Sequence, residues 1–68
     1  MLRGVLAANI RYWRGRRKLS QEALADVAGF HRTYVGAVER SEKNMSVDNI
    51  ERMAKALAIE PLELLRKR

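Results

Sequence analysis

Apolar residues recur along this chain at intervals of three and four positions, a spacing that places them on one face of an α-helix. Leu6, Ile10 and Trp13 follow this spacing near the start of the chain, and Met53 and Leu57 follow it again further along. No stretch alternates apolar and polar residues between turn-forming clusters, as a half-buried β-strand would. The pattern therefore predicts an all-α protein.

The same pattern predicts five helices joined by short connections. We expect them at about residues 3 or 4 to 17, 21–28, 32–40, 47–58 and from 61 onward. Ser20 and Ser46 precede two of these helices and can cap them, because a serine hydroxyl accepts a hydrogen bond from a free backbone amide. Gly29 follows the second helix, where a left-handed residue commonly ends a helix. Pro61 suits the first turn of the last helix, since proline has no amide hydrogen to leave unpaired.

Length and composition restrict the class of protein further. A chain of 68 residues allows one compact core, so we expect a single domain over residues 1–68. Cysteine is absent and His31 is the only histidine, so the ligands of a structural zinc site are lacking. We expect no metal, no cofactor and no small-molecule ligand, and self-association to supplement the small core. The first ten residues lack the uninterrupted apolar stretch of a signal peptide, and we expect a cytoplasmic protein.

The charge balance favours an anionic partner. The chain has 14 Lys and Arg against 8 Asp and Glu, a net charge of +6, which suits nucleic acid or an anionic membrane surface. Membrane binding would need a large apolar face on a helix, and here those faces are needed for the core. An enzyme is not expected, because the chain has one His, no Cys and no glycine-rich phosphate loop.

The segment from Gln21 to Arg40 resembles the helix-turn-helix of phage repressor, Cro and Xre-type regulators. The resemblance is carried by Leu19–Ala25, Gly29–Val35, Val38–Arg40, Met53–Leu57 and Glu60–Leu65. Within this family, His31–Gly36 with Glu39–Arg40 and Lys43–Asn44 is most similar to the controller proteins of restriction-modification systems. The resemblance implies a compact five-helix domain of the lambda-repressor type. It also implies a homodimer that binds inverted-repeat operators in double-stranded DNA and controls a restriction-modification system.

The residues themselves also support this motif. The small side chain of Ala25 lets two helices approach where they cross, and Gly29 makes the turn between them. The alternative interpretation is a helical hairpin with a glycine cap and no role in nucleic-acid binding.

The third predicted helix offers one face to a DNA major groove. At about 100° per residue, Val35 and Val38 face the core and the opposite side faces outward. Arg32 could bond both acceptors of a guanine edge, and the methyl group of Thr33 or Ala37 could touch a thymine methyl. The candidate base-reading residues are Arg32, Thr33, Tyr34, Gly36 and Ala37. The alternative for Arg32 and Thr33 is plain solvated surface.

Other basic and polar residues are candidates for phosphate contacts. We expect these contacts from Gln21 at a helix N-terminus, and from Arg40, Lys43 and Asn44 before the fourth helix. A basic cluster near the first connection fits either long-range attraction or ordinary solvated charge: Arg11, Arg16, Arg17 and Lys18. Lys18 also stands where the related family often has glycine.

Glu39 lies close to the core side of the third predicted helix, where a lone carboxylate would be costly. The resemblance places an arginine, here Arg14, against it. We therefore expect Arg14 and Glu39 to form a structural ion pair with no role in base reading.

Self-association is expected through the last two helices, because their apolar stripe exceeds what one small core can cover. The candidate contacts are Met45, Val47, Ile59, Leu62 and Leu65. Leu62 and Leu65 are also expected to pack inward.

Three further expectations concern single residues and the end of the chain. Trp13 is expected in the core and not as a stacking platform for bases. His31 is expected to cap a helix or contact a phosphate, and Arg66, Lys67 and Arg68 are expected to form a frayed tail.

The alternative functions are an antitoxin or phage-type repressor of the same fold and, in a different class, a basic protein-interaction or membrane-surface module.

Overall fold

Five α-helices make up most of residues 2–68, the part of the chain that the computed structural model describes. They are α1 (Leu2–Arg16), α2 (Gln21–Ala28), α3 (Arg32–Glu39), α4 (Val47–Leu57) and α5 (Pro61–Leu65). No strand occurs within these residues, and none of their helices has the length and apolar character needed to cross a membrane. The all-α prediction is confirmed, and each predicted boundary lies within two residues of the observed one.

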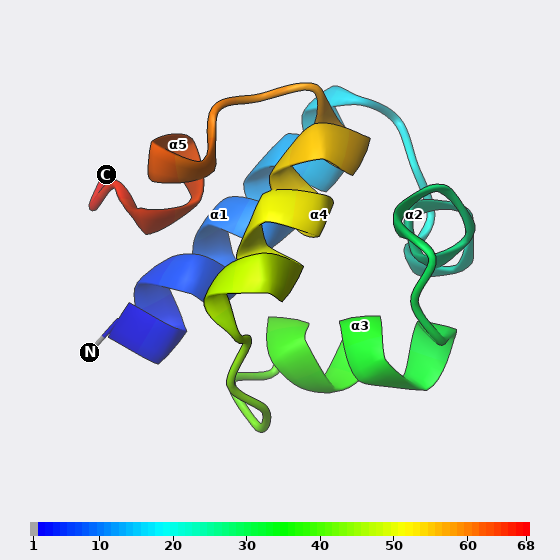
Figure 1. Cartoon of the computed structure of the whole chain (residues 1–68), viewed down its shortest axis with the longest axis horizontal. Helices are drawn as coiled ribbons and strands as arrows, with labels where there is room; N and C mark the ends of the chain where they lie inside the picture. Colours follow the sequence, from blue (N-terminus) through cyan, green and yellow to red (C-terminus); the bar gives the residue numbers. More distant parts are fainter. Residues whose placement is uncertain (1) are drawn as a thin grey trace.

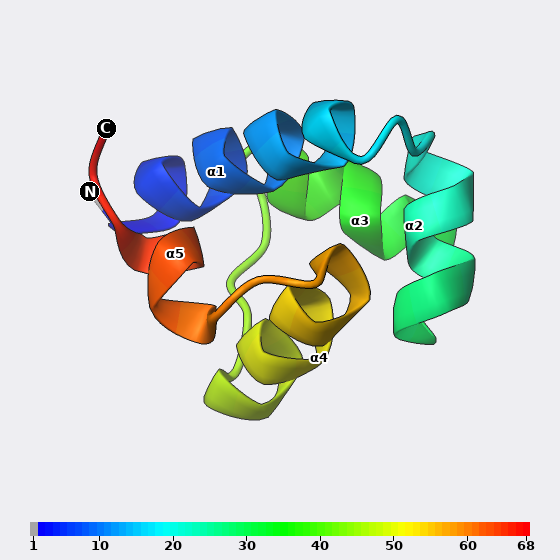
Figure 2. The ribbon, with the colours of Figure 1, turned by 90° about the horizontal axis from the view of Figure 1, so that it is seen from above.

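The helix α1 is the longest of the five, and the other helices pack against it or against one another. In Figure 1, α2 and α3 lie together at one end, and α5 lies beside the first turns of α1. Figure 2 shows the same arrangement from above, with α4 on the side away from α1. Contacts join α1 to α3 and α5, α2 to α3 and α4, and α4 to α5. Both helices of the predicted motif are therefore supported on their core side.

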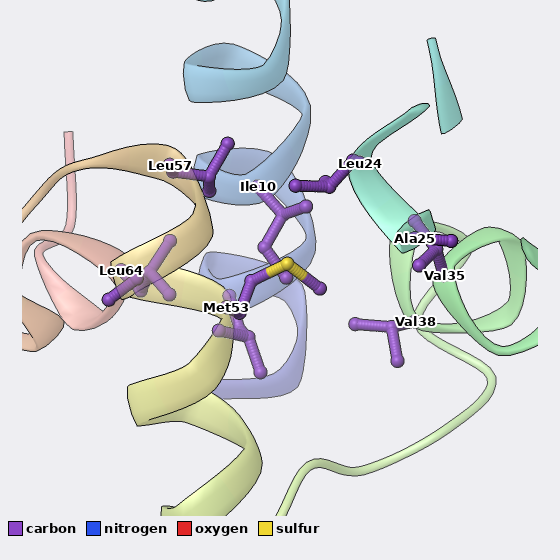
Figure 3. Packing of buried hydrophobic residues seen from close by; sticks show 10 residues of the cluster. Ile10, Leu24, Ala25, Val35, Val38, Met53, Leu57 and Leu64 are labelled. Carbon is purple, nitrogen blue, oxygen red and sulfur yellow. The ribbon is translucent and has the colours of Figure 1, made fainter. Parts of the chain in front are cut away.

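One apolar core lies where the helices meet. Its fully buried side chains come from all five helices and include Ile10, Leu24, Val35, Val38, Met53, Leu57 and Leu64. Figure 3 shows Met53 reaching from α4 toward the side chains of α2 and α3, beside Ile10. Trp13 packs against the edge of this core, as its spacing from Ile10 predicts.

Side-chain caps fix where three of the helices begin. Ser20 caps α2 and Ser46 caps α4, each hydroxyl accepting a hydrogen bond from the amide three residues further on, at 3.0 and 3.1 Å. His31 caps α3 with its ring Nδ1, which accepts from the amide of Thr33 at 3.2 Å. The capping role predicted for these residues is confirmed.

Residues in the left-handed region follow the ends of four helices, α1 to α4. They are Lys18 (φ 58°), Gly29 (φ 77°), Ser41 (φ 62°) and Ala58 (φ 59°). Gly29 adopts this conformation without steric cost, whereas the Cβ of the other three makes it unfavourable. Lys18 thus takes up the conformation that the glycine often found there in the family would favour.

The short helix α5 docks differently from the sequence-based expectation. Leu64 is fully buried, whereas Leu62 and Leu65 are 77% and 36% exposed. The prediction that Leu62 and Leu65 pack inward is wrong, because so short a helix with three leucines has no periodicity that selects one face. A tertiary contact selects it instead: Asn9, buried in α1, donates from Nδ2 to the carbonyl oxygen of Leu64 at 2.8 Å.

The same asparagine holds the residues that follow α5. Asn9 Nδ2 also donates to the carbonyl oxygen of Arg66 at 2.8 Å, and its Oδ1 accepts from Nε of Arg68 at 3.1 Å. The guanidinium group of Arg68 lies 4.2 Å from the ring centroid of Tyr12. The expected frayed tail is therefore wrong. A buried amide side chain needs hydrogen-bond partners, and these residues supply them.

Candidate nucleic-acid interface

The helices α2 and α3 cross closely because small residues lie between them. Ala25 is only 2% exposed. Its carbonyl oxygen accepts from the amide of Phe30 at 2.8 Å, which closes the turn around Gly29. The sequence therefore folds into a helix-turn-helix between Gln21 and Arg40, with α3 as the second helix of the motif.

Glu39 at the end of α3 is only 3% exposed and is bonded from two other helices. Arg14 of α1 donates from Nε to Oε2 at 2.7 Å and from Nη2 to Oε1 at 3.0 Å. Gln21 of α2 donates from Nε2 to Oε1 at 2.9 Å. The carboxylate of Glu39 thus joins α1, α2 and α3 at one point, and the two-pronged bond with Arg14 is the strong form of such a pair.

The positions of Gln21 and Gly36 differ from those expected for a phosphate contact and a base-reading residue. Nε2 of Gln21 donates to Glu39, and the Gln21 side chain is half-buried. Gly36 is buried, and a Cβ added to it would lie 3.2 Å from Nη1 of Arg40 and 3.4 Å from Oε1 of Gln21. The expectation that Gly36 presents an open outward surface is wrong, because the side chains of Gln21 and Arg40 cover it.

A surface hollow lies between the N-terminal turn of α2 and the outer side of α3. It is lined by Arg14, Ser20, Gln21, Glu22, Arg32, Thr33, Gly36 and Arg40. Nη1 of Arg32 lies 3.7 Å from Oε2 of Glu22, with both side chains 68% exposed. Such an exposed pair contributes at most about 1 kcal/mol, so Arg32 can turn toward another acceptor. Thr33 is also exposed, and Ala37 is half-buried.

Tyr34 points away from this hollow toward the loop before α4. Its hydroxyl donates to the carbonyl oxygen of Asn44 at 3.4 Å and accepts from Nδ2 of Asn49 at 3.2 Å. Its ring lies 5.1 Å from that of Phe30, centroid to centroid. The prediction that Tyr34 reads bases does not fit this placement, because the aromatic ring is used to pack α3 against its neighbours.

The loop between α3 and α4 exposes the other candidate phosphate contacts. Arg40, Lys43 and Asn44 are all exposed. Nη2 of Arg40 lies 3.1 Å from Oε1 of Glu42, and Oδ1 of Asn44 accepts from Nε of Arg3 at 2.7 Å. The structure thus brings the loop and the hollow together at the C-terminal end of α3, where Arg40 belongs to both.

Several arginines bond to the C-terminal carbonyl groups of helices, a role that the sequence reasoning missed. Arg52 donates from Nη2 to the carbonyl oxygens of Gly29 at 2.7 Å and Ala28 at 3.1 Å, at the end of α2. Arg11 bonds to the carbonyl oxygen of Glu39 in the same way. The last turns of α2 and α3 contain no basic residue of their own, which is the signal that could have indicated such caps.

Arg17 performs the same role for α4. It donates to the carbonyl oxygens of Leu57 at 2.7 Å and Ala58 at 3.2 Å. Arg11 and Arg17 are therefore structural as well as charged, which corrects their interpretation as free attraction or solvated charge alone.

The residues predicted for self-association form two groups. Val47, Leu62 and Leu65 are 75%, 77% and 36% exposed, whereas Met45 and Ile59 are half-buried against the core. Met45 and Leu65 also line an apolar surface groove, whose other lining residues are Leu2, Arg3, Leu6, Asn44 and Ile50. Three of the six large apolar side chains exposed within residues 2–68 therefore belong to the predicted set.

Most of the chain matches known helix-turn-helix proteins. The helix-turn-helix family model matches residues 10–64. The Control protein C.SmaI of Serratia marcescens is 46% identical over 56 residues, which cover 82% of this chain and 67% of that protein. This chain spans 58–67% of the length of the curated relatives that it matches.

Two crystal structures are similar to this fold. The hypothetical transcription factor NHTF from Neisseria has a TM-score of 0.95 at 48% identity, covering 97% of this chain and 76% of that chain. The restriction-modification controller protein C.AhdI from Aeromonas hydrophila has a TM-score of 0.88 at 45% identity, covering 91% and 94% of the two chains. Because the family model covers residues 10–64 and these relatives are close to half identical, this chain belongs to the helix-turn-helix family.

Proposed function

We propose that this chain is a DNA-binding transcription regulator that controls a restriction-modification system, acting in the cytoplasm as a single domain over residues 1–68. It binds inverted-repeat operators in double-stranded DNA as a homodimer. The observation that carries the proposal is the exposure of Arg32 and Thr33 on α3, beside a hollow lined by three arginines. In helix-turn-helix proteins the second helix of the motif enters the major groove. This role for α3 requires no catalytic step.

Base reading falls to the exposed residues Arg32 and Thr33 and to the half-buried Ala37 one turn further along α3. The guanidinium group of Arg32 can donate to both acceptors of a guanine edge, and the methyl group of Thr33 or Ala37 can contact a thymine methyl. Gly36 contributes by leaving room for Gln21 and Arg40, since a side chain there would press on both. Tyr34 contributes by holding the following loop.

Phosphate contacts anchor the protein on either side of the groove. Lys43 and Asn44 are exposed on the loop after α3, and Arg40 stands where this loop begins. At the other side, the free backbone amides in the first turn of α2 include that of Gln21. Gln21 therefore contacts a phosphate through its main chain, because its side chain is bonded to Glu39.

Two observations support a homodimer formed through α4 and α5. Val47 and Leu62 are 75% and 77% exposed, and burying such side chains in an interface is favourable. The apolar core of the described residues is also small, and association commonly supplements a small core. In a symmetric dimer the two copies of α3 would lie about 34 to 36 Å apart, in successive major grooves.

Similarity to the controller proteins supports the proposal that this chain regulates a restriction-modification system. The Serratia relative is named a control protein and the Aeromonas relative a restriction-modification controller protein, at 46% and 45% identity. The segment of α3 and the following loop that resembles such proteins also contains the proposed readers and anchors. We therefore place the operator beside the genes of a restriction-modification system.

Selection from a pool of random-sequence duplexes tests the proposal, because the protein itself then chooses its operator. The duplexes retained by the protein over repeated rounds are sequenced. We expect an inverted repeat whose half-sites are spaced by about one helical turn, and the same repeat upstream of the regulated genes. Retention of duplexes without any shared sequence would contradict base reading by α3, and retention of isolated half-sites would contradict the homodimer.

A further inference from the structure

An arginine outside the helix-turn-helix is hydrogen-bonded to the loop between α3 and α4. Arg3 in the first turn of α1 donates from Nε to Oδ1 of Asn44 at 2.7 Å, and from Nη1 to the carbonyl oxygen of Ser41 at 3.4 Å. Lys43 lies between these two bonded residues in the sequence. Arg3 therefore holds the loop on both sides of a proposed phosphate contact.

Other contacts within the described residues also hold this loop. Ser41 has a left-handed backbone, and the amide of Glu42 donates to the carbonyl oxygen of Ala37 at 2.9 Å. The hydroxyl of Tyr34 reaches the carbonyl oxygen of Asn44 at 3.4 Å. The contact of Arg3 with Asn44 is thus the shortest side-chain hydrogen bond to this loop in residues 2–68. Arg3 is the main restraint on the orientation of Asn44.

This contact decides which atom of Asn44 is offered to a ligand. An arginine side chain can only donate, so the amide oxygen of Asn44 must face Arg3. The amide nitrogen of Asn44, a donor, then points elsewhere and is free to meet an acceptor such as a phosphate oxygen. Asn44 is exposed, so the surface around this nitrogen is open to solvent.

We propose that Arg3 is both a positioning residue for Asn44 and a phosphate-binding residue of the DNA interface, an inference that rests on the function proposed above. Its side chain is exposed, and Nη2 makes no hydrogen bond within residues 2–68. Nε and Nη1 of Arg3 bond to the loop, which leaves Nη2 of the planar guanidinium group as a donor for a phosphate. The first turn of α1 thus belongs to the same surface as the loop.

Binding of four variants to duplex DNA tests this role. Fluorescence anisotropy gives Kd for an operator obtained by selection and for a scrambled duplex, over a range of salt concentrations. Arg3→Ala is expected to weaken binding to both duplexes about tenfold and to make the plot of log affinity against log salt shallower by about one unit. Arg3→Lys keeps the charge without the planar fork. It should restore the salt slope but only part of the affinity.

Arg16→Ala is the matched control, because it removes one positive charge from the opposite end of α1, where Arg16 bonds to Tyr12. We expect its affinity to stay within about twofold of wild type. Equal affinities of Arg3→Ala and Arg16→Ala would overturn the role of Arg3. If Lys43→Ala still weakened binding in that case, the proposed function would stand. A wild-type protein without preference for any duplex would overturn both proposals.

Discussion

Glu39 is a buried carboxylate whose hydrogen bonds come from α1 and α2. Taking such a group out of water is costly unless it is paired and fully hydrogen-bonded. Arg14 and Gln21 supply these bonds, and Arg14 also donates to the carbonyl oxygen of Leu19 at 3.0 Å. The pair therefore fixes α3 relative to α1 and to the connection before α2.

Removal of either partner is expected to destabilise the fold. Arg14→Ala leaves Glu39 buried without its counter-charge and should lower the free energy of unfolding by about 3 to 5 kcal/mol. Glu39→Ala should cost less, because Arg14 is 24% exposed and can turn toward water. Urea unfolding measures both changes, with Arg16→Ala as an exposed control expected within about 0.5 kcal/mol of wild type. Wild-type stability of both pair variants would show that the ion pair does not support the fold.

Lys18 carries backbone strain that a glycine would relieve. Its φ of 58° places the Cβ in an unfavourable position, so Lys18→Gly is expected to raise the free energy of unfolding by about 1 kcal/mol. Lys18→Ala separates this effect from loss of the side chain and its charge, because alanine retains the Cβ. The expectation is contradicted if the two variants have equal melting temperatures.

At the scale of helices, arginines from one part of the chain donate hydrogen bonds to the C-terminal carbonyl groups of a helix in another part. Arg52 of α4 bonds to the last carbonyl groups of α2, and Arg17 after α1 bonds to those of α4. The carbonyl groups of a final helical turn have no partner within the helix, and they form the negative end of its dipole. An arginine from a neighbouring part of the chain donates hydrogen bonds to these carbonyl groups and places a positive charge at the negative end of the dipole. It also joins the two parts of the chain.

Arg52 offers the clearest test of this arrangement. Its guanidinium group also lies 4.3 Å from the ring centroid of Phe30. Arg52→Ala should therefore lower the free energy of unfolding by about 1 to 2 kcal/mol through lost hydrogen bonds and lost contact with the ring. Lys55→Ala, which removes an exposed cation from the same helix, should have little effect. Thermal unfolding would contradict the capping role if both variants melted alike.

Helix positions could be predicted from the sequence because their signals are local. Ser20, Ser46, Gly29 and Pro61 each act on the backbone beside them, and the observed boundaries follow. The inward face of α5 could not be predicted, because it depends on Asn9, which is more than fifty residues away in the sequence. Contacts of that kind leave no periodic pattern.

The face of α3 could be predicted only in part. Arg32 and Thr33 are exposed as expected, since the helical period alone places them. Tyr34 and Gly36 are not, because their surroundings come from the loop before α4 and from the first residue of α2. Helical geometry gives the direction of a residue but not the neighbours that cover it.

At the scale of the whole molecule, self-association remains a prediction with a direct test. The wild-type protein is expected to sediment as a dimer at high micromolar concentration, and Leu62→Glu to sediment as a monomer with little loss of stability, since Leu62 is 77% exposed. Val27→Glu places the same charge at an exposed apolar residue of α2, outside the proposed interface, and should remain dimeric. A wild-type monomer, with or without DNA, would contradict the dimer. A dimeric Leu62→Glu would place the interface elsewhere.

The central claim is that α3 reads bases while the following loop anchors the backbone, and a comparison of Arg32→Ala with Lys43→Ala tests it most directly. On the selected operator, Arg32→Ala should cost about 1 to 3 kcal/mol, and much less on a duplex altered at the base pair that Arg32 contacts. Lys43→Ala should weaken binding to all duplexes alike and make the salt dependence shallower by about one unit. Equal losses of specific and random binding in Arg32→Ala would contradict the account, because Arg32 would then be an anchor and not a reader.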